Sequence, residues 1–304
     1  MNRWTLFSVS LALAAMVLGA SCADSSGNPG SDAGVDGGGG GGGSVPDPAC
    51  NGSPRLCDLR FDEVSYPTTH NAMSNAENDW REPNQNFNIT RQLNDGIRAL
   101  MLDTYNQEGE LLLCHAVCGL GSQPLVEGLG EIRTFLENNP SEVVSIIFES
   151  TIEHAETASA IEESGLLGFT YAHVAGEPWP TLRELIDDGT RLVVFQDKAG
   201  DADYPWLMDI WDHAWETHFS WAAPQEFNCD PNRGDPDNSL FILNHFLTQG
   251  FGAPELAEMV NHNTLFIDRA EQCEEEGNAL PNFVTVDFYD IGDLFDVVES
   301  LNAP

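Results

Sequence analysis

Basic residues are the scarcest class in this chain of 304 residues. Twelve Lys and Arg residues stand against 49 Asp and Glu residues, so the formal net charge is −37 at pH 7. A surface with this balance repels nucleic acid and anionic membranes. The composition therefore excludes a nucleic-acid-binding protein. It is typical of a highly soluble or salt-adapted protein rather than of one with a specific cationic partner.

The signatures of several large enzyme classes are absent as well. The predicted folded part contains no phosphate-cradling glycine loop, no dinucleotide-binding fingerprint and no Gly-x-Ser-x-Gly nucleophile motif. These absences argue against a P-loop enzyme, a dinucleotide-dependent oxidoreductase and a serine hydrolase of that type.

One apolar run follows Arg3 at the N-terminus. It ends in small residues before Cys22 and is too short to span a membrane as a stable helix. A basic start, a short apolar segment and small residues predict a signal peptide over residues 1–21. The residues before Cys22 resemble a bacterial lipoprotein cleavage site, although Leu18 lies one place further from the cysteine than usual. Ordinary signal cleavage is the alternative.

Residues 22–49 consist largely of Gly, Ser, Asp and Pro and have little apolar surface to bury. We interpret them as a flexible tether. After a lipidated Cys22, such a tether would hold a folded domain, residues 50–304, at a membrane surface. We therefore expect an exported chain, either a cell-envelope lipoprotein or a secreted protein. We also expect a monomer.

The six cysteines beyond Cys22 favour disulfides. An even number in an exported chain argues against metal ligands and against a thiol nucleophile. Six cysteines allow many connectivities, and the sequence leaves them open. We favour the two local pairs, which leaves the two remaining cysteines for each other: Cys50–Cys57, Cys114–Cys118 and Cys229–Cys273.

From residue 60 the chain alternates short β-rich runs with helical patterns, which predicts repeated βα units. Several predicted strands are almost wholly apolar, as in strands buried on both faces of a sheet. The predicted strands are 64–69, 99–104, 110–115, 143–149, 191–197, 239–245 and 282–288. The predicted helices are 86–95, 124–138, 153–164, 181–187, 254–261, 264–276 and 292–302. Segment 199–236 is rich in Trp, Asp and Pro and is predicted to be irregular. About 250 residues of this pattern suit a single eight-stranded α/β barrel.

Titratable residues follow three successive predicted strands. His70, Asp103 and His115 each close a short apolar run. Parallel strands that end together bring their last residues together, so we expect these side chains to meet. Histidine gives or takes a proton near neutral pH, and a pair of histidines suits a general base and a general acid. The alternative is that both histidines lie at the edge of the core and hydrogen-bond only to backbone groups. The Asp between them favours acid–base chemistry.

Two basic residues lie near these strand ends. Lys198 is the only lysine in the chain and comes directly after an apolar strand, which makes it a candidate phosphate contact. A solvated surface lysine is the alternative. Arg98 adjoins the strand that carries Asp103, where it is expected to brace a carboxylate or to reach a substrate phosphate.

Six segments resemble one known family. They resemble the X domain of phosphatidylinositol-specific phospholipase C, and in particular the PLC-like phosphodiesterases of bacteria and fungi. The resemblance covers roughly residues 60–302. The segments are Thr69–Met73, Gly96–Tyr105, Leu113–His115, Asn139–Val144, Leu243–Thr248 and Pro281–Tyr289.

The resemblance implies a distorted TIM (β/α)8 barrel with one histidine as general base and one as general acid. The matching residues are His70 and His115. His70 would take the proton from the inositol 2-hydroxyl as that oxygen attacks phosphorus, and His115 would protonate the departing diacylglycerol oxygen. The product would be a cyclic inositol phosphate. Asp287 would orient His70, and Asp103 would hold or assist His115. The expected substrate contacts are Arg98, Lys198, Asn244 and Tyr289.

The resemblance also makes calcium a candidate cofactor. Calcium-dependent members use an Asn after the first His, a Glu-x-Asp on the second strand and a later Glu. This chain offers Asn71, Asp103 and Glu149, but Met101 stands where the first carboxylate is expected. Calcium-independent bacterial members use an arginine where this chain has Tyr105. Three oxygen ligands with water suit Ca²⁺, and Lys198 or Arg98 is the alternative source of positive charge.

Two other functions remain open at the level of sequence. The first is a related phosphodiesterase for another head group, such as a glycerophosphodiester or a sphingolipid, because pocket contacts and not acid–base groups choose the alcohol. The second is a cell-surface barrel that binds inositol or lipid without turnover, which Met101 and Tyr105 motivate. Tryptophans are candidates to line the head-group pocket: Trp80, Trp206, Trp211, Trp215 and Trp221.

Overall fold

The computed structural model describes residues 49–304. The predicted signal peptide, Cys22 and the tether as far as residue 48 lie outside the described residues. The described residues belong to one compact unit. In the described part of the chain, no helix has the length and apolar character needed to cross a membrane.

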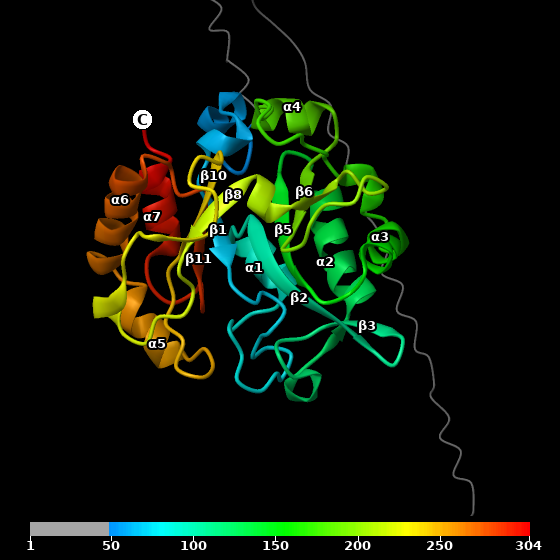
Figure 1. Ribbon diagram of the computed structural model, residues 1–304, viewed down its shortest axis with the longest axis horizontal. Coiled ribbons are helices and arrows are strands. Elements are labelled where there is room, and N and C mark those ends of the chain that lie inside the picture. The colour runs from blue at the N-terminus through cyan, green and yellow to red at the C-terminus, as the bar shows by residue number, and fades with distance from the viewer. Residues whose placement is uncertain (1–48) are drawn as a thin grey trace, which may run out of the picture. The chain divides into compact units, whose positions relative to one another are not determined.

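Eight parallel strands form the centre of this unit. Their order in the sheet is β7-β6-β5-β2-β1-β11-β10-β8, and every neighbouring pair in this order is parallel. The strands are β1 (Tyr66–Thr69), β2 (Ala99–Gln107), β5 (Val144–Ser150), β6 (Leu192–Gln196), β7 (Leu207–Asp209), β8 (Ala214–Thr217), β10 (Leu240–Asn244) and β11 (Phe283–Val286). Within residues 49–304, no ladder joins β7 to β8. The sheet is therefore a curled, incomplete TIM-like barrel (Figure 1).

Helices cover the outside of the curled sheet. In Figure 1, α7 lies beside β1 and β11 with α6 packed on α7, whereas α2 packs on α1 and α3. All seven predicted helices are confirmed: α1 (Ile89–Asp95), α2 (Leu125–Asn138), α3 (His154–Glu163), α4 (Leu182–Asp187), α5 (Pro254–Val260), α6 (Leu265–Gly277) and α7 (Leu294–Leu301). Side-chain caps explain two of the starts, because Asn88 accepts from the Arg91 amide and Thr181 accepts from the Glu184 amide.

The prediction of a parallel barrel strand over 110–115 is wrong. Residues Glu110–Leu113 form β3, which runs antiparallel to β2. The cause is a two-residue turn, Glu108-Gly109, in which both residues have positive φ (54° and 94°). Such turns match the twist of a hairpin and send the chain back along its partner. The short strand β4 (Gln123–Pro124) then pairs with β3.

The prediction that 199–236 is irregular is also wrong in part. This segment supplies two of the eight barrel strands, β7 and β8, and the antiparallel edge strand β9 (Pro231–Gly234). Each has only three or four residues. A strand this short gives too few residues for an alternating or continuous apolar pattern to stand out.

Both faces of the strands are buried, as their apolar sequences predict. Leu100, Ile146 and Val284 belong to the core between sheet and helices, whereas Ala99 and Ile242 belong to the core inside the barrel. The inner core fills the amino-terminal end of the barrel, so the carboxyl ends of the strands are left to line a cavity.

All three predicted disulfides are confirmed: Cys50–Cys57, Cys114–Cys118 and Cys229–Cys273. They differ greatly in the length of chain that they close, since the third spans 44 residues and the first spans seven.

Loss of the third disulfide is expected to lower the free energy of unfolding by about 4 kcal/mol, because a long loop loses the most conformational entropy on closure. Loss of the first is expected to cost about 2 kcal/mol. Urea unfolding of the paired Cys→Ser variants at Cys229/Cys273 and at Cys50/Cys57 measures both values. Equal losses in the two variants would show that loop length does not set this contribution.

Candidate active site

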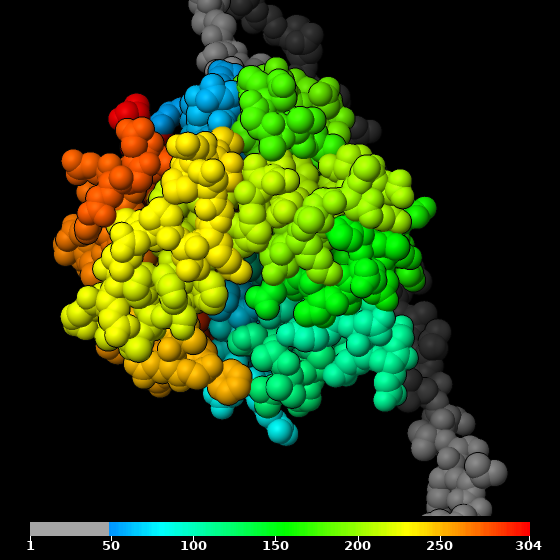
Figure 2. Space-filling model, viewed as in Figure 1, coloured from blue at the N-terminus to red at the C-terminus, as the bar shows by residue number. Residues whose placement is uncertain are grey.

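A cavity opens at the carboxyl ends of the barrel strands. Its apolar wall includes Met101, Ile147 and Ile242, which continue the inner core. The surface in Figure 2 is hollowed where the yellow segment meets the green and cyan segments. Polar side chains from six strands or strand ends line the cavity: His70, Asn71, Asp103, Glu149, Asp197, Glu216 and Asn244.

The imidazole of His70 is held at both ring nitrogens. Nδ1 lies 2.9 Å from Oδ1 of Asp287, and Nε2 lies 3.1 Å from Nδ2 of Asn71. An amide nitrogen donates and a carboxylate accepts. Nδ1 therefore carries the proton, and the unprotonated Nε2 accepts from Asn71. This is the tautomer that a general base at Nε2 needs. Asn71 reaches back to its neighbour because its backbone is left-handed (φ 47°), a conformation that Asn tolerates.

Asp287 is buried and fixed by its own neighbours. Its Oδ1 also accepts from Nδ2 of Asn84 at 3.0 Å, and its carbonyl accepts from Nδ2 of Asn261 at 2.9 Å. The loop between β10 and α5 covers the carboxylate so closely that a Cβ on Gly252 would lie 2.8 Å from Oδ2 of Asp287. Only glycine fits there without moving the carboxylate.

Gly252→Ala is expected to lower kcat by about 10- to 100-fold, the usual cost of disturbing a residue that orients a catalytic group. A Cβ at this place would push Asp287 away from His70. Gly168→Ala is the control, because no atom lies within 4 Å of a Cβ there. Steady-state kinetics of the two variants make the comparison, and equal kcat values would contradict the assigned packing.

His115 faces the same space from a different structural element. A second cavity shares His70, Asn71, Asp103 and Glu149 with the first and is also lined by His115. His115 follows β3 in the loop that the Cys114–Cys118 disulfide closes. Both histidines thus line one cavity, but His115 arrives through a hairpin and not through a parallel strand. Within the described residues, Asp103 makes no hydrogen bond to His115, so the predicted support of His115 by Asp103 is not seen.

The surroundings of the two histidines shift their pKa values in opposite directions. Burial lowers the pKa of His70, but the charge and hydrogen bond of Asp287, with the charges of Asp103 and Glu149, outweigh it and raise the pKa. Burial and the charge of His70 lower the pKa of His115. Burial and repulsion by Glu149 and Asp197 raise the pKa of Asp103 to about 8. The cavity is therefore crowded with carboxylates.

One guanidinium lines the first cavity. Arg233, on β9, is the one Lys or Arg among the described residues that line the two cavities. Its Nε lies 2.5 Å from Oε1 of Glu216, and its guanidinium lies over the rings of Trp211 and Phe219 at 4.5 and 4.6 Å. Glu216 also accepts from Nδ2 of Asn244 through Oε2 at 2.9 Å.

Three predicted substrate contacts lie away from the cavities. Arg98 precedes β2 at the opposite end of the strand and pairs with Glu142 at 2.7 Å, so it braces a carboxylate. Lys198 points its ammonium at the carbonyl of Ile152, because the chain turns after β6 and leaves Asp197 on the cavity side.

Tyr289 points away from His70 as well. Its hydroxyl donates to Oδ2 of Asp95 at 2.8 Å, behind the sheet. Of the four predicted substrate contacts, Asn244 alone lines one of the two cavities that His70 lines.

Some residues of the cavity wall were not predicted. Glu216 and Arg233 come from β8 and β9, which are too short to be detected from sequence. Of the five candidate tryptophans, only Trp211 lines one of these two cavities. Trp215 stacks on Phe241, and the remaining three pack against apolar clusters.

The oxygen donors suit a hard cation. Among residues 49–304, no three His, Cys, Asp or Glu side chains form a ready-made metal cluster. Asn71, Asp103 and Glu149 nevertheless line both cavities and offer only oxygen to a metal, the ligand that Ca²⁺ prefers. The negative charges of Glu149 and Asp197 around Asp103 make a cation chemically suitable there.

Comparison with known proteins agrees with this architecture. The family described as PI-PLC X 1 matches residues 56–302. The PI-PLC X domain-containing protein 1 of Arthroderma benhamiae is 31% identical over 277 residues, which cover 84% of this chain and 89% of that protein. An uncharacterized secreted protein of the same fungus is 29% identical over 83% of this chain, which spans only 64% of that relative. A structure of the phosphatidylinositol-specific phospholipase C of S. aureus, with 14% identity, superposes with a TM-score of 0.53 over 82% of this chain and 95% of that one.

Proposed function

This chain belongs to the PI-PLC X family, and from that premise we propose that it cleaves a phosphatidylinositol-like phosphodiester as a phospholipase C. The observation that supports the proposal most is the pair of imidazoles on one cavity. Nε2 is the unprotonated nitrogen of His70, and His115 lines the same space. A barrel that only bound lipid would have no need for two proton-transfer groups arranged in this way.

In the proposed reaction, Nε2 of His70 takes the proton from the inositol 2-hydroxyl. The freed oxygen forms a bond to phosphorus, and the bond from phosphorus to the glycerol oxygen breaks. His115 gives its proton to that oxygen, so the products are diacylglycerol and a cyclic inositol phosphate. Water can then open the ring by the reverse proton transfers. Asp287 keeps Nδ1 of His70 protonated and stabilises the imidazolium that forms.

The substrate's own charge has a part in this scheme. Burial and the charge of His70 lower the pKa of His115. A general acid must be protonated before the leaving group departs. A phosphodiester anion beside His115 favours its imidazolium. Substrate binding thus favours the protonated form of His115, which the general acid needs.

We further propose that Asn71, Asp103 and Glu149 hold Ca²⁺ when the enzyme is active. A bound divalent cation would offset negative charge that develops on the phosphoryl oxygens. The three side chains would be the protein's contribution to the site, with Asp197 close enough in the cavity wall to add charge.

Removal of calcium with a chelator is expected to lower turnover by about 100-fold or more, and added calcium should restore it. Calorimetry of calcium binding by the wild type and by Asp103→Asn checks the site without any substrate. Full turnover in the chelator would reject the metal and leave the histidine assignment standing.

We propose that the chain works outside the cytoplasm. Three disulfides are typical of an oxidising compartment, and one relative is named as a secreted protein. The finer proposal is a lipid anchor on Cys22. Incorporation of labelled fatty acid into the wild type but not into Cys22→Ser would support the anchor, and equal labelling would reject it.

Release of soluble inositol phosphate from phosphatidylinositol vesicles tests the activity. Wild-type protein should release it, whereas His70→Ala should not. His262→Ala is the matched control, because His262 is exposed and pairs with Glu258 away from both cavities.

Cleavage of sphingomyelin or glycerophosphodiesters alone would identify a related phosphodiesterase. Binding without turnover in any metal would identify an inactive barrel.

A further inference from the structure

One face of the His70 imidazole is covered by an aromatic ring. The ring of Phe246 stacks on it with centroids 4.1 Å apart and planes 10° apart. Phe246 is buried, at 2% exposure, although it borders the cavity. The hydrogen bonds at Nδ1 and Nε2 fix two atoms of the imidazole but leave the ring free to tilt about the line between them. A flat neighbour against the face removes that tilt.

The alternation of side chains at the end of β10 brings Phe246 to this place. Asn244 lines the cavity, His245 points to the helix side, and Phe246 returns to the cavity. The backbone is held here, because the His245 amide donates to the Thr285 carbonyl at 2.8 Å. On the far side, the ring of His245 stacks on Phe266 with centroids 3.9 Å apart.

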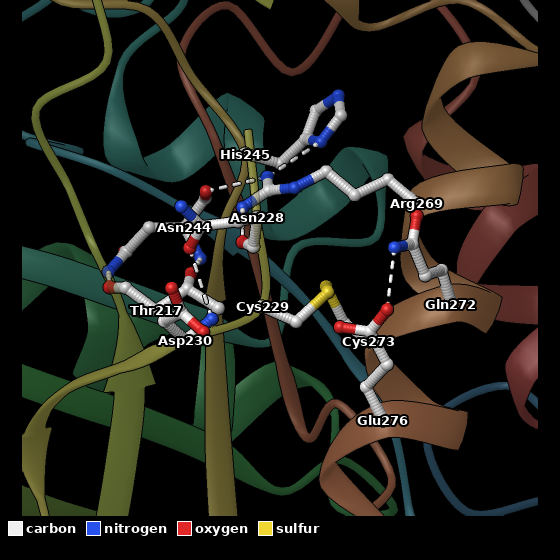
Figure 3. The surroundings of a disulfide bond; sticks show 10 residues. All are labelled: Thr217, Asn228, Cys229, Asp230, Asn244, His245, Arg269, Gln272, Cys273 and Glu276. Carbon is white, nitrogen blue, oxygen red and sulfur yellow. Dashed lines mark hydrogen bonds between the residues drawn. A yellow bond between two sulfur atoms is a disulfide. The ribbon is translucent and has the colours of Figure 1, made fainter. Parts of the chain in front are cut away.

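A buried arginine anchors this strand end from behind (Figure 3). Nη1 of Arg269 donates to the Asn244 carbonyl at 2.8 Å and to Nδ1 of His245 at 3.1 Å. Since arginine only donates, Nδ1 of His245 accepts, and Nε2 of His245 donates to the Val260 carbonyl at 2.8 Å. Burial lowers the pKa of Arg269 only to about 9, so the side chain keeps its charge at neutral pH.

This anchor is costly to the fold. Among the described residues, no carboxylate pairs with Arg269, and its Nε has no partner. A buried cation without a counter-charge destabilises a protein relative to a well-packed apolar residue. The Cys229–Cys273 disulfide fixes both sides of this arginine (Figure 3). Cys273 lies one turn beyond Arg269 on α6. Asn228, next to Cys229, accepts from Nη2 of Arg269 through its carbonyl at 3.3 Å.

We propose that Phe246 is a positioning residue for His70, and that Arg269 keeps Phe246 in place by fixing the end of β10. The proposal rests on the role of His70 as general base. Phe246 would keep Nε2 aimed at the substrate hydroxyl. Its removal should therefore slow the chemical step more than it weakens substrate binding.

Phe246→Leu is expected to lower kcat by about 10- to 100-fold with KM changed less than about threefold, as when a group that orients a catalytic residue is lost. Phe246→Tyr keeps a flat face and should recover most of kcat. Phe241→Leu is the matched control. Phe241 is a buried phenylalanine on β10, the strand that leads to Phe246, and it stacks on Trp215, not on His70. The Phe241→Leu variant should lose a comparable free energy of unfolding in urea and keep the wild-type kcat.

NMR of the imidazole protons of His70 makes the test independent of turnover. A stacked aromatic ring shifts these signals, so Phe246→Leu should move them and Phe241→Leu should not. If the wild type cleaves no phosphodiester, the proposed function fails while the NMR result still decides the stacking. Wild-type kcat in Phe246→Leu, an equal loss in Phe241→Leu, or unmoved His70 signals would each overturn the proposal.

Discussion

Replacing Asp287 with Asn is expected to lower kcat by about 10⁴-fold, the cost known for the corresponding change in a Ser-His-Asp triad. The carboxylate accepts the Nδ1 proton of His70 at 2.9 Å and supplies the charge that raises the pKa of His70. An amide supplies no charge, and its NH₂ group favours the tautomer with the proton on Nε2. KM should change little, because Asp287 faces the imidazole and not the cavity.

Asp95→Asn is the matched control for this experiment. Asp95 accepts the hydroxyl of Tyr289, two residues beyond Asp287, at 2.8 Å on the outer side of the sheet. The kcat of the Asp95→Asn variant should stay close to the wild-type value. Steady-state kinetics of the two variants measure the difference, and an Asp287→Asn enzyme within tenfold of the wild type would remove Asp287 from the mechanism.

The second large effect is expected at His115 and should depend on the leaving group. His115→Ala should lower turnover of phosphatidylinositol by about 10²- to 10⁴-fold, the range of general acid catalysis. An inositol phosphate ester of p-nitrophenol needs no protonation of its leaving oxygen, so the same variant should cleave it with a loss of less than about tenfold. A loss of the same size on both substrates would mean that His115 holds the substrate and does not donate a proton.

The helices could be predicted from sequence because several signals agree there. The predicted range 124–138 differs from α2 by one residue, since its apolar period is clear and Asn139-Pro140 ends it. The range 292–302 contains α7, whose start is marked by Asp293. The most apolar strands, such as β5 and β6, were predictable for the same reason, since both of their faces are buried.

The errors come from features that involve few residues. The turn at Glu108-Gly109 reverses the chain, and a local apolar pattern is the same in a hairpin strand and in a barrel strand. The strands β7 and β8 have three and four residues, so no periodic pattern reveals them. The barrel was predicted correctly although two of its strands were not located.

Some residues of the candidate site could also be predicted from sequence, and others could not. His70 and Asp287 could be proposed because both follow apolar strands that a motif marks, and the structure joins them at 2.9 Å. Tyr289 belongs to the same motif, yet its side chain points behind the sheet to Asp95. Phe246 carried no chemical signal in the sequence. Its role follows only from the distance between two rings.

Phosphorus NMR of the wild type acting on phosphatidylinositol vesicles tests the central claim most directly. Attack by the inositol hydroxyl, driven by His70 and completed by His115, predicts that a five-membered cyclic phosphate appears first and that a phosphate monoester follows. A monoester formed without the cyclic compound, or the cyclic compound formed at an undiminished rate by His70→Ala, would contradict the account.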